Sequence, residues 1–536
     1  MSAVRLAEHM HTLRYVDGIN SPAVVRLSDI GGKDPGGVED KHCFKLLLAL
    51  LQRLGFLQLV TPVSGSFYTD CMKPSVFLNH LYSKNRTAFV RHVLGGQEDR
   101  IKQFWDGMLA RPKGRAFIRS HPDLADCTPA ELYNTVLLVL HEDAAPYSKA
   151  SSACHVSYSS LFGRGSDILT KWLFSSCVKE SGEIDIEMWA VFISDLNLCA
   201  QGILENGDRI AGKWRFPASF GKADMEALCM AWGCQSYNDV HEMCAWCRGN
   251  RSTLPHTDLR PSAPWRAPAH ALSDADFISR VRTNRHHPLA DARFFTVYFF
   301  RIDHMHVMDL NGTTGIWAGS VLRLLVNGDY GIGANQQERL DFLNADLDRF
   351  HQTNKSSSQL SDLRLQNLVL DGWSNLNGKL VKAANTRQLA PWVLEISIRF
   401  FTGPHAWHSS LKKVGVAINK MYSLMAASEF FMPPYSEAAF AAATLSLGKH
   451  WHGLRAYFLS IGEMHFHISP KLHYTMHFPE QNQLVNPRLV ANYGEESLMG
   501  VLSKMWGKSI SGPHSKTVQR HVMLRYMVLL AIVLEI

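Results

Sequence analysis

Short apolar runs separated by turn residues dominate the chain between residues 132 and 200. Thr135–His141 is branched and almost wholly apolar, and two acidic residues close it, which predicts a buried central strand. Cys154–Phe162 alternates polar and apolar residues and predicts a second strand, and Ile168–Val178 predicts a third. Ile186–Ile193 fits either a strand or a buried helix, because the period of so short an apolar run does not distinguish them.

In the later part of the chain, apolar residues recur at the spacing that is typical of helices. Ser320 to about Leu445 reads as mostly helical, and Glu437–Ile461 predicts one long apolar-rich helix. Phe294–Ile302 is rich in aromatic and branched residues and predicts a further strand. Strands followed by helices indicate an α/β fold, with a mixed-sheet core interrupted by a large, mostly helical insertion.

The change of pattern along the chain predicts four regions. They are a mostly helical N-terminal region of unknown role (1–130), the first part of the core (131–200), the insertion (201–480) and a C-terminal helical part of the core that carries Glu496 (481–536).

Composition excludes several classes of protein. The chain has 536 residues, of which 46% are hydrophobic and 19% charged without a long charge block, so a globular chain is expected. The first twenty residues contain no apolar signal-peptide core, and the most apolar stretch, Tyr526–Leu534, is far shorter than the roughly twenty residues that span a bilayer. We therefore expect no membrane partner. Ten mostly scattered cysteines indicate a reduced intracellular chain.

Two aspartates follow apolar runs. Asp143 closes the first predicted strand, and Asp195 ends the apolar run that begins near Ile186. Two such acids on neighbouring strands, with a third from a helix, can hold two Mg²⁺ ions about 3.5–4 Å apart for phosphoryl transfer. The alternative is that each is an ordinary turn residue.

Cys244 and Cys247 form the chain's one CxxC motif, which has the spacing of half a structural zinc site. His473 and His477 lie four residues apart, share one face if helical, and can supply the other half. A redox-active or coincidental CxxC, and ordinary histidines in a chain that has 26, are the alternatives.

Two further acidic motifs follow. Asp303 and His306 are placed to form a hydrogen-bonded pair that orients a site, although Asp303 could equally cap a helix. Glu495 and Glu496 begin the last helical region, where acids commonly complement the helix dipole.

The net charge is +7, and the segment Arg248–Arg293 holds eight arginines against four aspartates. Such a segment is either a solvated surface or an electrostatic footprint for phosphate. In the second interpretation Arg280, Arg282 and Arg285 contact phosphate groups.

The order of these motifs resembles the CACTA (En/Spm) superfamily of DNA transposases. The order is Asp143, Asp195, Cys244–Cys247, Asp303–His306, His473–His477 and Glu496. Its most specific parts are Ile302-Asp-His-Met-His306 and Glu496-Ser-Leu-Met-Gly500, and the match spans about 135–510. Asp195 is followed by Leu-Asn where the family has an aromatic-Pro step, and Glu495 is a rival for the position of Glu496.

The resemblance implies an RNase H-like core and cleavage and transfer of double-stranded DNA. Asp143, Asp195 and Glu496 would hold Mg²⁺ or Mn²⁺, and the two cysteines and two histidines would form a closed structural Zn²⁺ site. Asp303 and His306 would support the site or position DNA. Arg280, Arg282 and Arg285 would contact the phosphates of the DNA. A nuclear location and a possible homo-oligomer are further expectations. The alternative is a catalytically decayed, transposon-derived protein that binds DNA or another partner.

Overall fold

The computed structural model describes most of the chain beyond residue 48. The described residues are 49, 51–52, 55–64, 68–148, 151–163, 170–178, 182–224, 228, 232, 234, 238–284, 287–356, 358–509 and 515–534. They divide into two compact units. The first unit takes its residues from Met1–Gly233, Val281–Phe300 and Tyr493–Ile536, and the second from Cys234–Arg280 and Arg301–Asn492. The second unit thus begins later and ends later than the predicted insertion (201–480).

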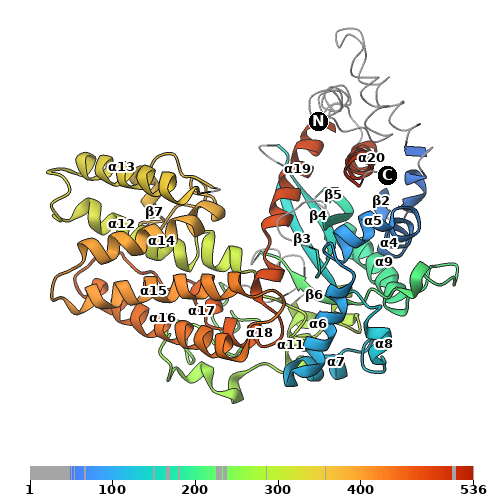
Figure 1. Cartoon of the computed structure of the whole chain (residues 1–536), viewed down its shortest axis with the longest axis horizontal. Coiled ribbons are helices and arrows are strands. Elements are labelled where there is room, and N and C mark those ends of the chain that lie inside the picture. Colours follow the sequence, from blue (N-terminus) through green and yellow to red (C-terminus); the bar gives the residue numbers. More distant parts are fainter. Residues whose placement is uncertain are drawn as a thin grey trace, which may run out of the picture. The chain divides into compact units, whose positions relative to one another are not determined.

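A four-stranded mixed sheet forms the centre of the first unit (Figure 1). Its strands are β3 (Leu138–Pro146), β4 (Ser152–Ser160), β5 (Lys171–Val178) and β6 (Ala218–Lys222). The order is β5-β4-β3-β6, in which β3, β4 and β5 are antiparallel and β6 runs parallel to β3. The three predicted strands are confirmed, and the α/β class with them.

The two faces of β3 carry different chemistry. Side chains alternate along a strand, so His141 and Asp143 lie on one face, while Leu140 and Glu142 lie on the other. Both faces are largely buried, because helices pack against each of them. This is why the run reads as continuously apolar up to its acidic end.

Helix α9 (Gly182–Gln201) covers the face that carries Glu142. The indole nitrogen of Trp189 donates to Glu142 Oε2 over 2.8 Å, and Phe192 stacks on Phe174 of β5 with ring centroids 4.2 Å apart. The run Ile186–Ile193 is therefore a buried helix.

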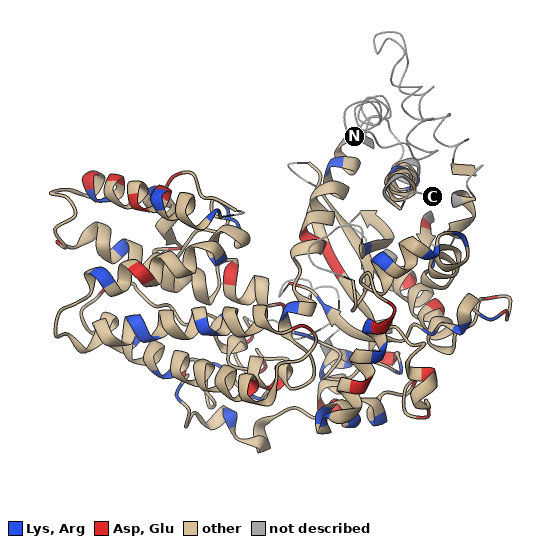
Figure 2. Cartoon of the chain, in the orientation of Figure 1, with Lys and Arg blue, Asp and Glu red and all other residues tan. Residues whose placement is uncertain are grey.

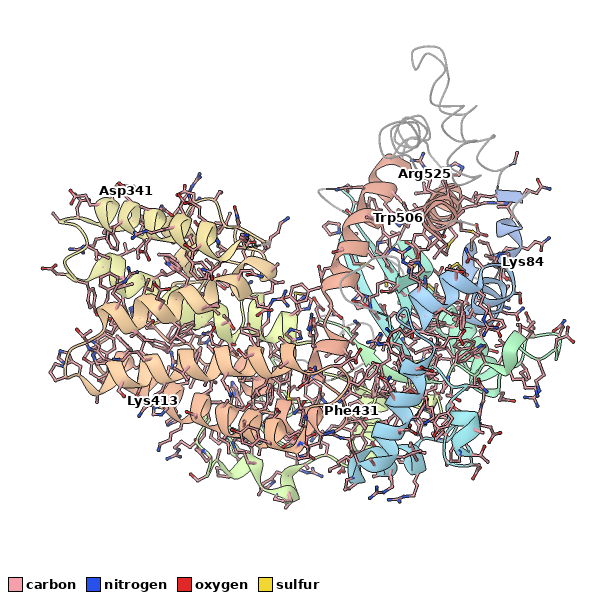
Figure 3. The ribbon with its side chains drawn as sticks, viewed as in Figure 1. Lys84, Asp341, Lys413, Phe431, Trp506 and Arg525 are labelled. Atoms are coloured by element: carbon pink, nitrogen blue, oxygen red, sulfur yellow. The ribbon has the colours of Figure 1, made fainter. Side chains whose placement is uncertain are left out.

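Helix α19 (Tyr493–Ser509) covers the opposite face, the one that carries Asp143. The indole nitrogen of Trp506, labelled in Figure 3, donates to Ser176 on β5. Ser176 pairs with His155, which in turn pairs with Asp143, so all three side chains lie on this face. Helix α20 (Ser515–Val533) contains most of the apolar C-terminal stretch, and the hydroxyl of Tyr526 bonds to Lys171 and Leu173 of β5.

The described residues before β3 include a hairpin besides helices. Strands β1 (Val60–Ser64) and β2 (Tyr68–Met72) pair with each other. The helices that follow are α4 (Pro74–Lys84), α5 (Arg86–Ala88), α6 (Asp99–Ala110), α7 (Pro112–Ser120) and α8 (Pro129–Leu132).

The second unit is mostly helical, as predicted for the insertion. Its longer helices are α12 (Thr313–Asn327), α13 (Gln336–Asn354), α14 (Ala383–Phe400), α15 (Ala406–Ala427) and α16 (Pro434–Ser460), and α17 (Pro470–Thr475) and α18 (Phe478–Asn482) follow them. Helix α11 (Asp274–Asn284) lies at the boundary of the two units in sequence.

The strand predicted at Phe294–Ile302 is wrong. The segment forms turns, with one isolated parallel bridge between Phe300 and Gly221 of β6. Phe294, Phe295 and Phe299 pack their rings against one another in the core. Burial of the aromatic rings, rather than strand pairing, therefore accounts for the β-prone composition.

Candidate metal centre and acidic sheet face

Four buried side chains of the second unit converge on one point. They are Cys244, Cys247, His473 and His477, and their ligand atoms all lie within 4.8 Å of one another. The cysteines come from a loop before α11, and the histidines from α17 and the residue that precedes α18. Because the two pairs are more than 220 residues apart in sequence, a bound ion would tie the beginning of the helical unit to its end.

The distances fit a tetrahedral ion. Zn–S bonds of about 2.3 Å and Zn–N bonds of about 2.05 Å predict edges of about 3.5 Å between sulfur and nitrogen and about 3.3 Å between two nitrogens. The structure has Cys244 Sγ 3.5 Å from His477 Nε2, and Cys247 Sγ 3.4 Å from His473 Nε2. The two Nε2 atoms are 3.3 Å apart. The quartet can therefore hold a structural metal such as zinc.

Backbone amide groups donate hydrogen bonds to the two cysteine sulfurs. The amide of Trp246 donates to Cys244 Sγ over 3.4 Å, and that of Gly249 donates to Cys247 Sγ over 3.2 Å. A Cβ on Gly249 would lie 2.9 Å from His473 Cε1 and 3.1 Å from Cys247 Sγ, so a larger residue would disturb the quartet. Trp265 covers the site, with its ring centroid 4.3 Å from that of His473.

Glu480 orients one of the histidines. Its Oε2 lies 3.1 Å from His477 Nδ1, the ring atom opposite the ligand nitrogen. Burial alone would lower the pKa of His477, but the Cys244 thiolate and Glu480 outweigh it and raise the pKa to about 10. A carboxylate bound to the second nitrogen of a metal-ligating histidine fixes the ring and its tautomer.

We expect Glu480→Gln to weaken zinc binding by about 10–100-fold without removing a ligand, because the carboxylate partner of His477 is lost. Competition with a chromophoric chelator would measure the change. As a control, Glu463→Gln alters a carboxylate beside His465, outside the quartet, and should leave the zinc affinity unchanged. Equal affinities for Glu480→Gln and the unaltered chain would show that Glu480 does not support the site.

The structure does not bring the three predicted catalytic acids together. Asp143 is half-buried on the face of the sheet under α19. Asp195 lies inside α9, on the other side of the sheet, so its assignment as a catalytic acid is corrected. Among the described residues, the cysteine–histidine quartet is the one group of three or more His, Cys, Asp or Glu ligand atoms close enough to hold a metal.

Asp195 has a structural role instead. Its carboxylate accepts hydrogen bonds from the amide and the hydroxyl of Ser75, at 2.9 and 2.5 Å. Ser75 lies in the first turn of α4, where backbone N–H groups have no partner within the helix. Asp195 therefore caps α4 from a neighbouring helix, and burial raises the pKa of its carboxyl group.

Glu495, the rival of Glu496, is the acid that α19 buries against the sheet. It is 1% exposed, and its Oε1 lies 2.7 Å from Lys222 Nζ and 3.2 Å from Lys171 Nζ. Burial would raise the pKa of Glu495, but the two ammonium groups outweigh it and lower the pKa to about 2. Glu496 is half-buried, and the next position on a helix points about 100° away.

Asp224 is a candidate that the sequence reasoning missed. In the parallel pairing of β3 and β6, His141 lies opposite Lys222. Asp143 follows His141 by two residues within β3, and Asp224 follows Lys222 by two residues just beyond the end of β6, so both acids lie on the C-terminal side of this pair. The sequence feature that could have identified Asp224 is its position just after the run Ala218–Lys222. This run was not predicted as a strand because it is short and contains a glycine.

Asp303 and His306 form the predicted pair in the second unit. His306 Nδ1 lies 2.5 Å from Asp303 Oδ2, and Asp303 also accepts from the backbone amides of Met305 and His306. The amide of Asn492 donates to Asp303 Oδ1 over 3.0 Å. Asp303 therefore bonds to the turn that follows it and to Asn492, the last residue of the unit.

The predicted DNA-contacting arginines have acidic partners. Arg280 pairs with Glu242 over 3.2 Å, and Arg282 pairs with Asp291 over 2.8 Å. Arg285 lies outside the described residues. Local ion pairs therefore offset much of the positive charge that the composition of this segment suggested.

Within the described part of the chain, none of the helices combines the length and apolar composition that a bilayer span requires. No protein-family model matches this sequence, and none of the curated proteins is significantly similar to it.

Proposed function

We propose that the chain is a transposase-like protein that cleaves and joins DNA strands by metal-dependent phosphoryl transfer on an RNase H-like core. The observation that carries the proposal is the parallel pairing of β3 and β6, in which Asp143 lies two residues beyond His141 and Asp224 lies two residues beyond Lys222, the partner of His141. The strand order and the acid-bearing helix α19 on the face of Asp143 support it further.

Asp143, Asp224 and Glu496 are the proposed acidic trio. Glu495 is excluded because Lys171 and Lys222 already neutralise it in the interior. The three carboxylates would hold Mg²⁺ or Mn²⁺, which supply an activated nucleophile and stabilise the leaving 3′-oxygen. Since these three acids do not form a group close enough to hold a metal, their carboxylates would have to approach one another when the cations bind.

We expect Asp143→Asn and Asp224→Asn each to reduce Mn²⁺-dependent nicking of supercoiled plasmid by about a thousandfold, because each removes a charged metal ligand. Asp195→Asn is the matched control and should keep its activity, since asparagine can still accept hydrogen bonds from Ser75. Circular dichroism would confirm that each variant is folded. Loss of nicking in Asp195→Asn with full activity in Asp224→Asn would overturn the assignment.

A second candidate is a non-catalytic DNA-binding or interaction protein. The buried cluster of Lys171, Lys222 and Glu495 favours it, because two ammonium groups on this face oppose the binding of further cations. In this case the unaltered chain does not nick DNA, and Asp143→Asn binds DNA as well as the unaltered chain does.

A further inference from the structure

The exposed face of the α15–α16 hairpin carries three lysines, which we call the lysine face: Lys413 and Lys420 on α15, and Lys449 on α16. The lysines of α15 recur at helical spacing on its exposed side, where Val416 lies between them. Figure 3 labels Lys413 on its helix. The two helices pack along each other as an antiparallel pair joined by a short loop.

The lysine face lacks acidic partners. Helix α15 contains no acidic residue, and α16 contains only Glu437 in its first turn. Among the described residues, no ion pair involves Lys413, Lys420 or Lys449. The arginines predicted to contact DNA differ in this respect, since Arg280 and Arg282 are both paired.

The positive charges of the two helices lie near one another. Burial lowers the pKa of His450 on α16, and the charges of Lys413 and Lys449 lower it further. The imidazole of His450 lies 3.3 Å from the hydroxyl of Ser410 on α15. Figure 2 shows blue segments on α15 and α16 but several red ones on α13, so charge is unevenly distributed over this unit.

The spacing of the lysines suits an extended polyanion. Lys413 and Lys420 are two helical turns apart, about 10 Å along the axis, and packed helices lie about 8–10 Å apart. Ala442 and Gly453 flank Lys449 on the exposed side of α16, which also carries the exposed side chain of Leu445.

We propose that the lysine face binds the phosphate backbone of duplex DNA without regard to sequence. The choice of DNA among polyanions rests on the proposed function, whereas the position of the surface rests on the unpaired lysines. Binding through such contacts releases counterions, and each contact contributes about −0.9 to the slope of log K against log salt.

The test compares two triple variants of the full chain. Lys413→Gln/Lys420→Gln/Lys449→Gln alters the lysine face, and Lys355→Gln/Lys379→Gln/Lys382→Gln removes three other exposed lysines of the same unit as a control. Fluorescence anisotropy with a 30-base-pair duplex, without added Mg²⁺ or Mn²⁺ and without a chelator, measures affinity across a salt series. We expect the first variant to bind about tenfold or more weakly at 0.1 M salt, with a slope smaller by about 2–3, and the control to change less than twofold.

The outcomes separate this inference from the proposed function. Equal affinities for the two variants, or no binding of duplex DNA by the unaltered chain, would overturn the lysine face as a DNA surface. Binding only to an acidic protein would overturn it too. A third outcome is that the lysine-face variant alone loses DNA binding while the unaltered chain does not nick DNA. That result would support the lysine face and refute the catalytic proposal.

Discussion

Cys247→Ser should abolish binding of the one zinc ion that we expect per chain and should destabilise the helical unit. Removing one thiolate opens a quartet whose ligand atoms already lie at tetrahedral distances. Structural zinc binding is worth about 10–16 kcal/mol in small zinc-dependent peptides. This unit also has a large apolar core, so a smaller effect is expected, a fall in Tm of about 10 °C.

Elemental analysis of the purified chain and differential scanning calorimetry would make both measurements. Cys177→Ser is the control, because Cys177 is a buried cysteine of the other unit and is not part of the quartet. It should retain one zinc. A zinc content well below one per chain before any substitution, or full zinc in Cys247→Ser, would contradict a structural zinc site.

Glu495→Gln should destabilise the sheet unit by roughly 3–5 kcal/mol, the usual cost of removing one partner from a buried ion pair. The substitution leaves the ammonium groups of Lys171 and Lys222 close together in the interior without a compensating charge. Chemical denaturation at neutral pH would measure the loss. Glu496→Gln, one position further along α19, should change stability much less and should instead reduce nicking.

The effect should depend on pH in one direction. Folding lowers the pKa of Glu495 from 4.5 to about 2, so the folded state favours the charged carboxylate. The stabilisation is thus complete above about pH 5 and is lost as the pH falls towards 2. The stability difference between Glu495→Gln and the unaltered chain should shrink over this range. A difference independent of pH would show that packing, rather than charge, explains it.

The sequence by itself determined the local features. A branched apolar run predicted β3, alternation of polar and apolar residues predicted β4, and a further short run predicted β5. An apolar-rich helical pattern predicted α16. These patterns depend on near neighbours in the sequence. It also supplied the cysteine–histidine quartet, since the ligand types and short spacings of a metal site are visible in each half. Their convergence across more than 220 residues was an expectation until the structure placed the four atoms together.

Only the tertiary structure decided which acids share a face. Asp143 and Asp195 both end apolar runs, yet one lies in a strand and the other in a helix on the opposite side of the sheet. The proposed trio takes Asp224 from the segment just beyond β6, and the buried lysines distinguish Glu495 from Glu496. Strand register and the partners of a buried charge depend on residues far away in sequence, so local patterns do not determine them.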